Sequence, residues 1–342
     1  MTIEVGRLGT ETLEWDAFVR TCEDGSPFHL TAWKRAVESA YGLRSHYLLA
    51  RNGDALVGVL PLFEVRGLLG GRGLVSVPFA VYGGICATSD AARRALVDAA
   101  RALASVRGCS YVELRHRRDQ GLGLPTKSRY VTFSRAISKD EEENARAIPR
   151  KQRRMTREGR KHGLRTTLGR QYVDTVYDIY AESVHRLGSP VFSRRLFHAV
   201  LDAFEKDADV LAVWHGEQIV AGVLSLFYED QVLPYYGADL RVKKLNGVAD
   251  FMYWELMCHA AHAGYRVFDF GRSREGTGSY DFKRHWGFEP VPLPYQYILL
   301  NGARMPDLSP SNPRFRLATE LWKRLPLGVT KAVGPVLTRY VP

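Results

Sequence analysis

The sequence contains an internal repeat, which limits the possible folds more than any other feature. Residues 48–63 form two apolar stretches around a Gly-Asp pair at 53–54, and residues 211–227 form two around a Gly-Glu pair at 216–217. A glycine next to a polar residue between two short apolar runs is typical of a β-hairpin. Each half of the chain is therefore expected to contain a hairpin of the same kind.

The same series of elements follows each hairpin: a short Tyr-Gly strand, a helix that stops at a glycine, and another apolar strand. These elements are residues 82–84, 92–106 and 111–115 in the first half, and 236–238, 248–263 and 267–271 in the second. A strand that is followed by a crossover helix and a further strand indicates a parallel pair. The predicted fold class is α/β, with two tandem domains that each have a mixed, mostly antiparallel sheet and flanking helices.

The chain is long enough for two domains, because its 342 residues are about twice the usual domain length. We expect domains at 1–140 and 166–300, joined by a basic bridging helix at 141–165. Residues 301–342 form a basic amphipathic tail, which we expect to pack on the body of the protein. Contact of this tail with an anionic membrane is the alternative.

Several features favour a cytoplasmic protein, or one at the inner face of the cell membrane. No uncharged stretch is long enough for a membrane helix, and the N-terminus lacks the layout of a secretion signal. The four cysteines show no CxxC spacing, so neither a disulfide framework nor a metal knuckle is predicted. His259 and His262 lie one helical turn apart, but no third ligand stands nearby, so no metal site is predicted.

The net charge of +11 is concentrated in two segments, residues 144–170 and the tail at residues 301–342. Residues 144–170 contain ten lysines and arginines against one glutamate, and Arg150, Arg153 and Arg154 share one face of a predicted helix. Such a face can neutralise several phosphates, so a tRNA acceptor stem or a pyrophosphate-linked carrier would suit it. A solvated linker helix is the alternative.

Residues 268–288 combine a strand, a glycine-rich turn and a cluster of charged and aromatic side chains. Ligands gather where strands of an open α/β sheet end. Gly276 and Gly278 let backbone N–H groups turn toward an anion, and Arg272 and Arg274 can add charged hydrogen bonds. The sequence thus predicts a site for a phosphate-bearing substrate; a solvent-exposed loop is the alternative.

The duplicated layout resembles the GNAT acyltransferase fold, and the segment 268–288 with the tail 309–335 resembles the FemAB family of aminoacyltransferases. Within that family the two segments are similar to the subgroup associated with exosortase (PEP-CTERM) exopolysaccharide loci. The resemblance implies transfer of an amino acid from aminoacyl-tRNA to an amine of a cell-envelope or exopolysaccharide precursor. It also implies that Lys283, which follows Phe282, holds the reacting acyl group.

A lysine among aromatic side chains suits that role, because partial desolvation strengthens its field at a developing oxyanion. Lys283 stands between Phe282 and Trp286, and Tyr280 precedes them. We expect these three aromatic residues to contact the substrate. In the alternative, the lysine stem packs on Trp286 and the amine stays in water.

The transferred group must be attacked by a deprotonated amine, so a base is useful. Asp269 is the first candidate, with Glu275 and Asp281 as alternatives; a buried carboxylate bonded to the backbone is the other interpretation of Asp269. Tyr236 follows an apolar strand and is expected to line the acyl pocket, or to be a half-buried strand tyrosine.

A CoA-dependent enzyme of the GNAT class would show a glycine-rich, basic loop before its crossover helix. Residues 241–249 keep the basic residues and one glycine, and residues 88–93 keep none of this pattern. We therefore favour aminoacyl-tRNA over acyl-CoA as co-substrate, with no further cofactor, catalysis in the second half and acceptor recognition in the first. Two alternatives stay open: a CoA-dependent N-acyltransferase acting on an amino sugar, and a non-catalytic polyanion-binding protein.

Overall fold

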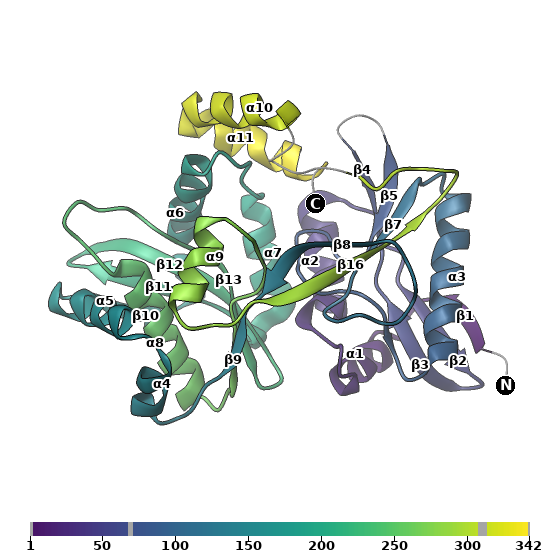
Figure 1. The fold of residues 1–342 in the computed structure, drawn as a ribbon, viewed down its shortest axis with the longest axis horizontal. Helices are drawn as coiled ribbons and strands as arrows, with labels where there is room; N and C mark the ends of the chain where they lie inside the picture. Colours follow the sequence, from purple (N-terminus) through teal and green to yellow (C-terminus); the bar gives the residue numbers. More distant parts are fainter. Residues whose placement is uncertain (1–2, 68–70, 307–312, 341–342) are drawn as a thin grey trace. The chain divides into compact units, whose positions relative to one another are not determined.

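The computed structural model describes residues 3–67, 71–306 and 313–340, with the backbone alone for 313–317. Contacts divide the chain into two compact units, each a mixed α/β structure (Figure 1). Unit 1 comprises residues 1–129, 292–318 and 333–342, and unit 2 comprises residues 130–291 and 319–332. The division falls at residue 130, and the basic helix predicted as a bridge lies inside unit 2. The domain ranges expected from the sequence stay a prediction.

Unit 1 contains a hairpin-based sheet and a second sheet that includes a parallel pair. Its strands are β1 (Ile3–Arg7), β2 (Leu48–Asn52), β3 (Ala55–Leu60), β4 (Phe63–Arg66), β5 (Arg72–Val75), β6 (Cys86–Ala87), β7 (Tyr111–Arg115), the first part of β8 (Thr126–Thr132) and most of β16 (Val291–Leu299). Its helices are α1 (Thr12–Thr21), the 3₁₀ turn η1 (Pro27–His29), α2 (Thr31–Tyr41) and α3 (Asp90–Val106).

The predicted hairpin, helix and last strand of the first half are confirmed. Strands β2 and β3 pair antiparallel, and α3 buries Leu96, Ala100 and Leu103 in one core with Leu48 and Leu60. The helix ends where expected, because Gly108 takes a φ of +64°. The parallel partner of β7 is β5.

The predicted strand at 82–84 is wrong, since these residues form no regular strand. Two glycines pack too closely for side chains there. A Cβ at Gly83 would lie 2.2 Å from Val77, and one at Gly84 would lie 2.3 Å from the ring of His116. The glycines therefore serve close packing in unit 1, in contrast to the matching Tyr-Gly pair of unit 2, which is part of a strand.

Unit 2 is built on a sheet with the order β10-β11-β12-β13-β14-β9. Its strands are β9 (Ser134–Ala136), β10 (Arg165–Leu168), β11 (Ala208–His215), β12 (Gln218–Tyr228), β13 (Gln231–Asp239), β14 (Val267–Asp269) and β15 (Ser273–Arg274). Its helices are α4 (Glu141–Ala147), α5 (Arg150–Lys161), α6 (Val173–Arg186), α7 (Arg194–Phe204), α8 (Val248–His262) and α9 (Gly278–His285), with 3₁₀ turns η2 (Arg170–Tyr172) and η3 (Glu205–Asp207).

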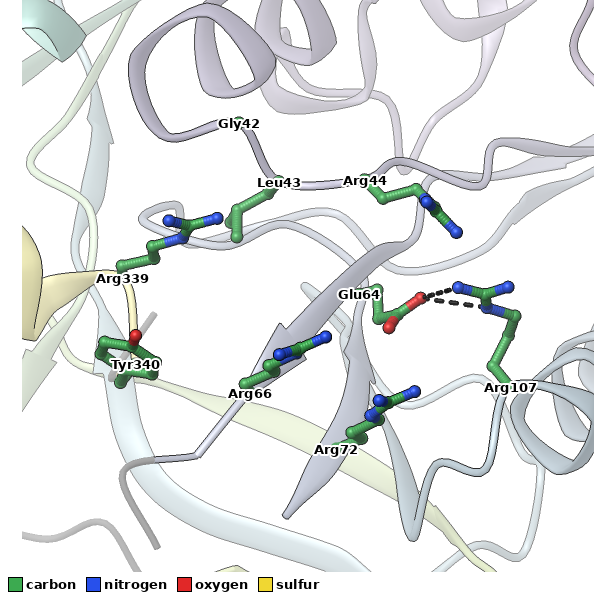
Figure 2. A pocket seen from close by; sticks show the side chains of 9 residues that line it. All are labelled: Gly42, Leu43, Arg44, Glu64, Arg66, Arg72, Arg107, Arg339 and Tyr340. Carbon is green, nitrogen blue, oxygen red and sulfur yellow. Dashed lines mark hydrogen bonds and ion pairs between the residues drawn. The ribbon is translucent and has the colours of Figure 1, made fainter. Parts of the chain in front are cut away.

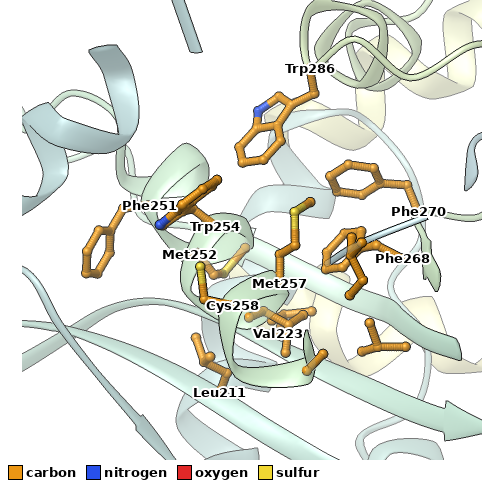
Figure 3. Close-up of a cluster of buried hydrophobic side chains, with 14 of the residues drawn as sticks. Leu211, Val223, Phe251, Met252, Trp254, Met257, Cys258, Phe268, Phe270 and Trp286 are labelled. Atoms are coloured by element: carbon orange, nitrogen blue, oxygen red, sulfur yellow. The ribbon is translucent and has the colours of Figure 1, made fainter. Parts of the chain in front are cut away.

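Helices cover both faces of this sheet, because its central strands are apolar on both sides. Leu211 and Val223 belong to the core that packs against α8 (Figure 3). Ala212, the residue after Leu211 on β11, packs on the opposite face of the sheet with Ile179 of α6. All-apolar central strands of this kind are expected where a sheet is covered twice.

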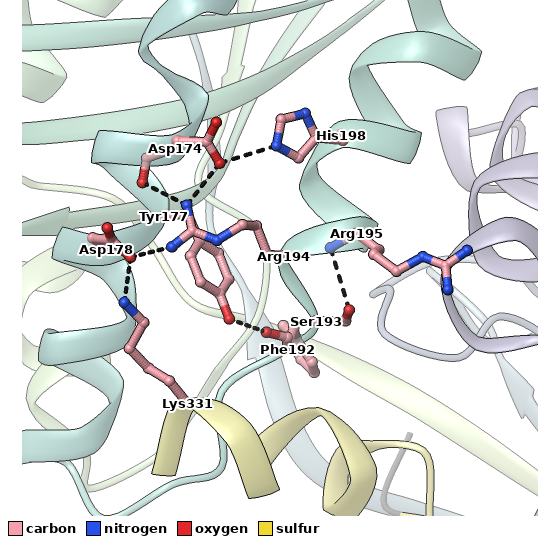
Figure 4. Close-up of polar contacts among 9 residues, drawn as sticks. All are labelled: Asp174, Tyr177, Asp178, Phe192, Ser193, Arg194, Arg195, His198 and Lys331. Atoms are coloured by element: carbon pink, nitrogen blue, oxygen red, sulfur yellow. Dashed lines mark hydrogen bonds and ion pairs between the residues drawn. The ribbon is translucent and has the colours of Figure 1, made fainter. Parts of the chain in front are cut away.

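A network of charged side chains fastens α6 to α7 (Figure 4). Arg194 donates to Asp174 at 2.6 Å and also to Asp178, and Lys331 approaches Asp178 at 2.6 Å. Lys331 belongs to α11 (Leu327–Thr338), which follows α10 (Pro313–Arg324). Within unit 2 the tail therefore contacts α6, and within unit 1 its last turn contacts α2, where Tyr41 and Thr338 are hydrogen-bonded at 3.1 Å.

In the described part of the chain, no helix has the length and apolar character needed to cross a membrane.

Candidate active site of unit 2

The strands β13 and β14 define the candidate site because they separate after a short parallel pairing. They pair at Gln231–Val267 and Val232–Phe268, and β13 then continues to Asp239. A bulge follows three residues after the last pair, since the register of β12 on β13 shifts at Tyr235. A bulge redirects the backbone, and a ligand can enter where parallel strands diverge.

Aromatic side chains gather beside this divergence. A Cβ at Gly237 would lie 2.7 Å from the hydroxyl of Tyr253, so only glycine lets that ring approach β13. The Tyr253 ring lies 5.0 Å from Phe270 and 5.6 Å from Phe282. Burial raises the pKa of Tyr253, so its hydroxyl stays protonated and can donate a hydrogen bond. Tyr253 carries no sequence signal of a site residue, because an aromatic residue on an apolar helix usually indicates packing.

Asp269 ends β14 and shapes the turn that follows. Its Oδ1 accepts hydrogen bonds from the Gly271 N–H at 2.7 Å and from the Thr132 hydroxyl at 3.5 Å. The bond to Gly271 accompanies a φ of +64° at that glycine. With 1% of its surface exposed, Asp269 matches the alternative of a buried carboxylate bonded to the backbone. Its role as a base stays a prediction.

Lys283 lies on α9, a short helix that the sequence analysis did not predict, although Thr277 is a typical N-cap and accepts from the Tyr280 N–H. The amine donates to the carbonyl oxygens of Phe270, Gly271 and Arg272 at 2.7, 3.0 and 3.1 Å. The side chain is 7% exposed, so the alternative of an amine in open water is wrong.

Several effects act on the charge of Lys283. Burial lowers its pKa to about 7, while the nearby Asp269 opposes this change. The three carbonyl acceptors also favour the ammonium form. In this structure Lys283 therefore stabilises the turn after β14. If the amine also contacts an acyl group, it does so while it is hydrogen-bonded to these three carbonyl oxygens.

The aromatic residues near Lys283 differ in exposure. Trp286 is fully buried and donates its indole N–H to Asp250 at 2.9 Å, which leaves it no surface for a substrate. Tyr280 is also buried, 5.5 Å from the Phe133 ring, and Tyr236 stacks on another ring in the core. Phe282 is half-buried beside Tyr253, so it has the best access of the predicted aromatic contacts.

The glycine-rich turn lies at the surface of unit 2. Gly276 and Gly278 are exposed, and Gly276 has a φ of +73°. Arg272 stacks over the Tyr130 ring at 4.6 Å, and Arg274 pairs with Tyr130 in a short ladder between β15 and β8. Both arginines are half-buried, so their predicted role in phosphate binding depends on side chains that already have protein contacts.

The basic face predicted on α5 is present. Arg150, Arg154 and Arg157 are exposed and Arg153 is half-buried, and together with Lys151 they line one surface hollow. The opposite face of α5 packs on α8, where a Cβ at Gly159 would lie 2.6 Å from Phe251.

Comparison with known proteins identifies the class of this domain. Residues 143–284 match the family model described as an acetyltransferase (GNAT) domain. The chain is an enzyme of the acyltransferase class, and the non-catalytic alternative is therefore not supported.

Solved structures show that the whole chain has the tandem GNAT fold. FemX has 15% identity and a TM-score of 0.69, covering 92% of this chain and 100% of FemX. L-PGS from Bacillus licheniformis has 14% identity and a TM-score of 0.57, covering 93% of this chain and 98% of that one. A tandem GNAT protein from the clavulanic acid biosynthesis pathway has 12% identity and a TM-score of 0.54, covering 89% and 100%. No curated protein matches the chain.

Proposed function

We propose that this protein is a FemAB-like N-acyltransferase that moves an aminoacyl group from aminoacyl-tRNA to an amine of a cell-envelope or exopolysaccharide precursor. The basic face of α5 carries the proposal, because it places exposed arginines within the acyltransferase domain. The exposed arginines at 150, 154 and 157 follow one another at helical spacing, so a phosphate backbone can contact several of them at once.

The loop before α8 supports tRNA over CoA. The single glycine of residues 241–249 is Gly247, which has a φ of +77°. A Cβ at this position would lie 2.2 Å from the Met155 carbonyl oxygen. This glycine therefore serves the close approach of the loop to α5 and is not free to cradle a pyrophosphate. An acyl-CoA enzyme remains the second candidate, because Arg241, Lys243 and Lys244 are exposed in the same loop and could contact phosphates there.

The proposed reaction needs one bond to form and one to break. The acceptor amine attacks the ester carbonyl of the aminoacyl-tRNA, the new C–N bond forms, and the bond to the ribose oxygen breaks. The amine loses a proton and the departing ribose oxygen gains one. Tyr253 is our candidate for the proton donor, because its hydroxyl lies against Gly237 of β13 beside the diverging strands.

The finer parts of this proposal rest on the sequence. The proposal includes membership of the exosortase-associated subgroup and acceptor recognition by the first half. It also includes a cytoplasmic location and a peripheral membrane contact of residues 301–342. No metal or cofactor besides the co-substrate is required by the reaction.

Charge reversal on α5 tests the tRNA assignment. We expect Arg150→Glu with Arg154→Glu to weaken binding of aminoacyl-tRNA by at least about 10-fold and to reduce the salt dependence of binding. The matched control reverses two exposed arginines of α3 in unit 1, Arg94→Glu with Arg101→Glu, and should bind like the wild type.

Transfer itself is measured with radiolabelled aminoacyl-tRNA and a set of amine acceptors, with labelled acetyl-CoA in parallel. Release of amino acid to an acceptor by the wild type, lost in the α5 variant, supports the proposal. Turnover of acetyl-CoA without any turnover of aminoacyl-tRNA would refute it and favour the second candidate.

A further inference from the structure

Unit 1 contains a hollow of about 360 Å³ that is surrounded by arginines (Figure 2). The charged residues that line it are Arg44, Arg66, Arg72, Arg107, Arg339 and Glu64. They come from five separate parts of the chain: the segment after α2, the strands β4 and β5, the end of α3, and the C-terminal segment. Five positive charges and one negative charge leave the lining with a net charge of +4.

Two of these arginines are placed so that their positive charges repel each other. Arg66 and Arg72 are directly opposite on the antiparallel strands β4 and β5, so their side chains leave the same face. Like charges in this position destabilise a sheet. Arg44, Arg66, Arg72 and Arg339 form no ion pair with any residue that the structure describes. Within the described part of the chain, no ion pair therefore offsets this repulsion.

The carboxylate of the hollow is already neutralised. Glu64 accepts hydrogen bonds from Arg107 at 2.8 and 3.0 Å, and lies 3.7 Å from His46. Glu64 therefore fixes Arg107 at the edge of the hollow and leaves the other guanidinium groups available to a ligand.

Hydrogen bonds at the C-terminal end of α11 fix the position of Arg339. Thr338 is buried, donates to the Pro335 carbonyl at 3.1 Å, and accepts from the Tyr41 hydroxyl at 3.1 Å. The Tyr340 N–H donates to the Leu337 carbonyl at 3.0 Å. These bonds hold the backbone on both sides of Arg339 within unit 1, so the arginine is presented by a built segment.

We propose that this hollow binds a diphosphate group. Planar guanidinium groups bond phosphate oxygens in pairs, and several of them converging on one hollow suit two adjacent phosphates. Among the described residues, Tyr340 is the only aromatic one that lines the hollow, whereas binding of single-stranded nucleic acid relies on several stacked rings. The site lies wholly within unit 1 and does not rest on the proposed transfer reaction.

Binding of inorganic pyrophosphate, measured by calorimetry at low salt, tests the site. We expect the double variant Arg66→Gln with Arg72→Gln to weaken pyrophosphate binding by about 10- to 100-fold, because two charged hydrogen-bond donors are lost. The control variant Arg94→Gln with Arg101→Gln removes two exposed arginines of α3 that do not line the hollow, and should bind like the wild type.

The same variant gives an independent readout in the absence of ligand. Because it removes a like-charge pair, we expect its melting temperature to stay unchanged or to rise by about 1–3 °C. Weaker binding in a protein of equal or greater stability cannot be a consequence of unfolding. Equal pyrophosphate affinity in the wild type and the double variant would overturn the proposal, as would an equal loss in the control.

Two further ligands distinguish the sources of a diphosphate. A soluble nucleoside diphosphate and vesicles that carry a prenyl diphosphate lipid are compared, each with wild type and double variant. Arginine-dependent binding of either supports the site and assigns its source. Arginine-dependent binding of a short RNA duplex, with no binding of pyrophosphate, would replace the diphosphate by nucleic acid and refute the proposal.

Discussion

Replacing Lys283 by methionine tests whether this buried amine stabilises unit 2. The substitution Lys283→Met keeps the length and most of the volume of the side chain, but removes all three donors. The carbonyl groups of Phe270, Gly271 and Arg272 then lose the amine that they share. The turn after β14 should become less stable in consequence.

The expected size follows from two opposing terms. Three hydrogen bonds from a charged donor contribute roughly 1.5–3 kcal/mol each. Burial of the amine opposes them, because desolvation disfavours the ammonium form and lowers its pKa to about 7. The hydrogen bonds are therefore partly offset, and we expect Lys283→Met to lower the free energy of unfolding by about 2 kcal/mol near pH 7.

The pH dependence gives the sharper result. The pKa of Lys283 is lower in the folded than in the unfolded chain, so the unfolded state binds more protons between about pH 7 and 10.5. The contribution of this residue to stability therefore rises with pH across that window, by up to about 1.4 kcal/mol per pH unit. The methionine variant lacks this contribution, so the difference between wild type and variant should widen from pH 7.5 to 9.5.

Urea unfolding, followed by the intrinsic fluorescence of the six tryptophans, measures both effects. The variant Arg284→Met is the matched control, because Arg284 is an exposed neighbour on α9. It should retain the stability and the pH dependence of the wild type. A Lys283→Met protein that is as stable as the wild type at both pH values, yet inactive, would refute the structural role and favour direct contact of the amine with the acyl group.

Two further predictions concern the packing and the charges of unit 2. Gly159→Ala should lower the free energy of unfolding by about 1–2 kcal/mol in thermal denaturation, because its Cβ would meet Phe251 at 2.6 Å; Gly278→Ala, in open space, should not. The Arg194 guanidinium lowers the pKa of Asp174 in the folded protein. The ionised Asp174 therefore stabilises the fold fully above its unfolded pKa of about 3.9, and this stabilisation is lost as the pH falls through its folded pKa. Asp174→Asn should remove this part of the acid sensitivity; an unchanged acid transition in that variant would contradict the inference.

The repeat made most of the fold predictable because turns and helix ends depend on local sequence. Gly53 and Gly216 both take positive φ in the two hairpins, and Gly108 and Gly264 do so after the two helices. The strand predicted around Gly83 failed for a reason that local sequence does not contain. That glycine is needed for contact with Val77, and such a contact is defined only once the chain has folded.

The site was less predictable, because burial of a polar side chain depends on distant partners. The sequence singled out Lys283 as a candidate site residue, but it could not show that three carbonyl groups at the end of β14 surround the amine. Tyr253 was missed for the complementary reason. Its spacing is that of a core residue, and only its approach to Gly237 reveals a hydroxyl beside the diverging strands. The arginine hollow has no sequence signal, since its members are up to 295 residues apart, from Arg44 to Arg339.

The two proposed anion sites can be separated because each is contained in one unit. The α5 face presents arginines at regular spacing along one exposed helix, which suits a long and regularly charged backbone. The hollow of unit 1 brings together arginines from distant segments around a small volume, which suits a compact and doubly charged group. A polyanion that competes for both should therefore lose affinity with each pair of substitutions, whereas pyrophosphate should respond to Arg66 and Arg72 alone. If the α5 variant weakens pyrophosphate binding as strongly, the charge of the whole chain governs binding and neither surface is specific.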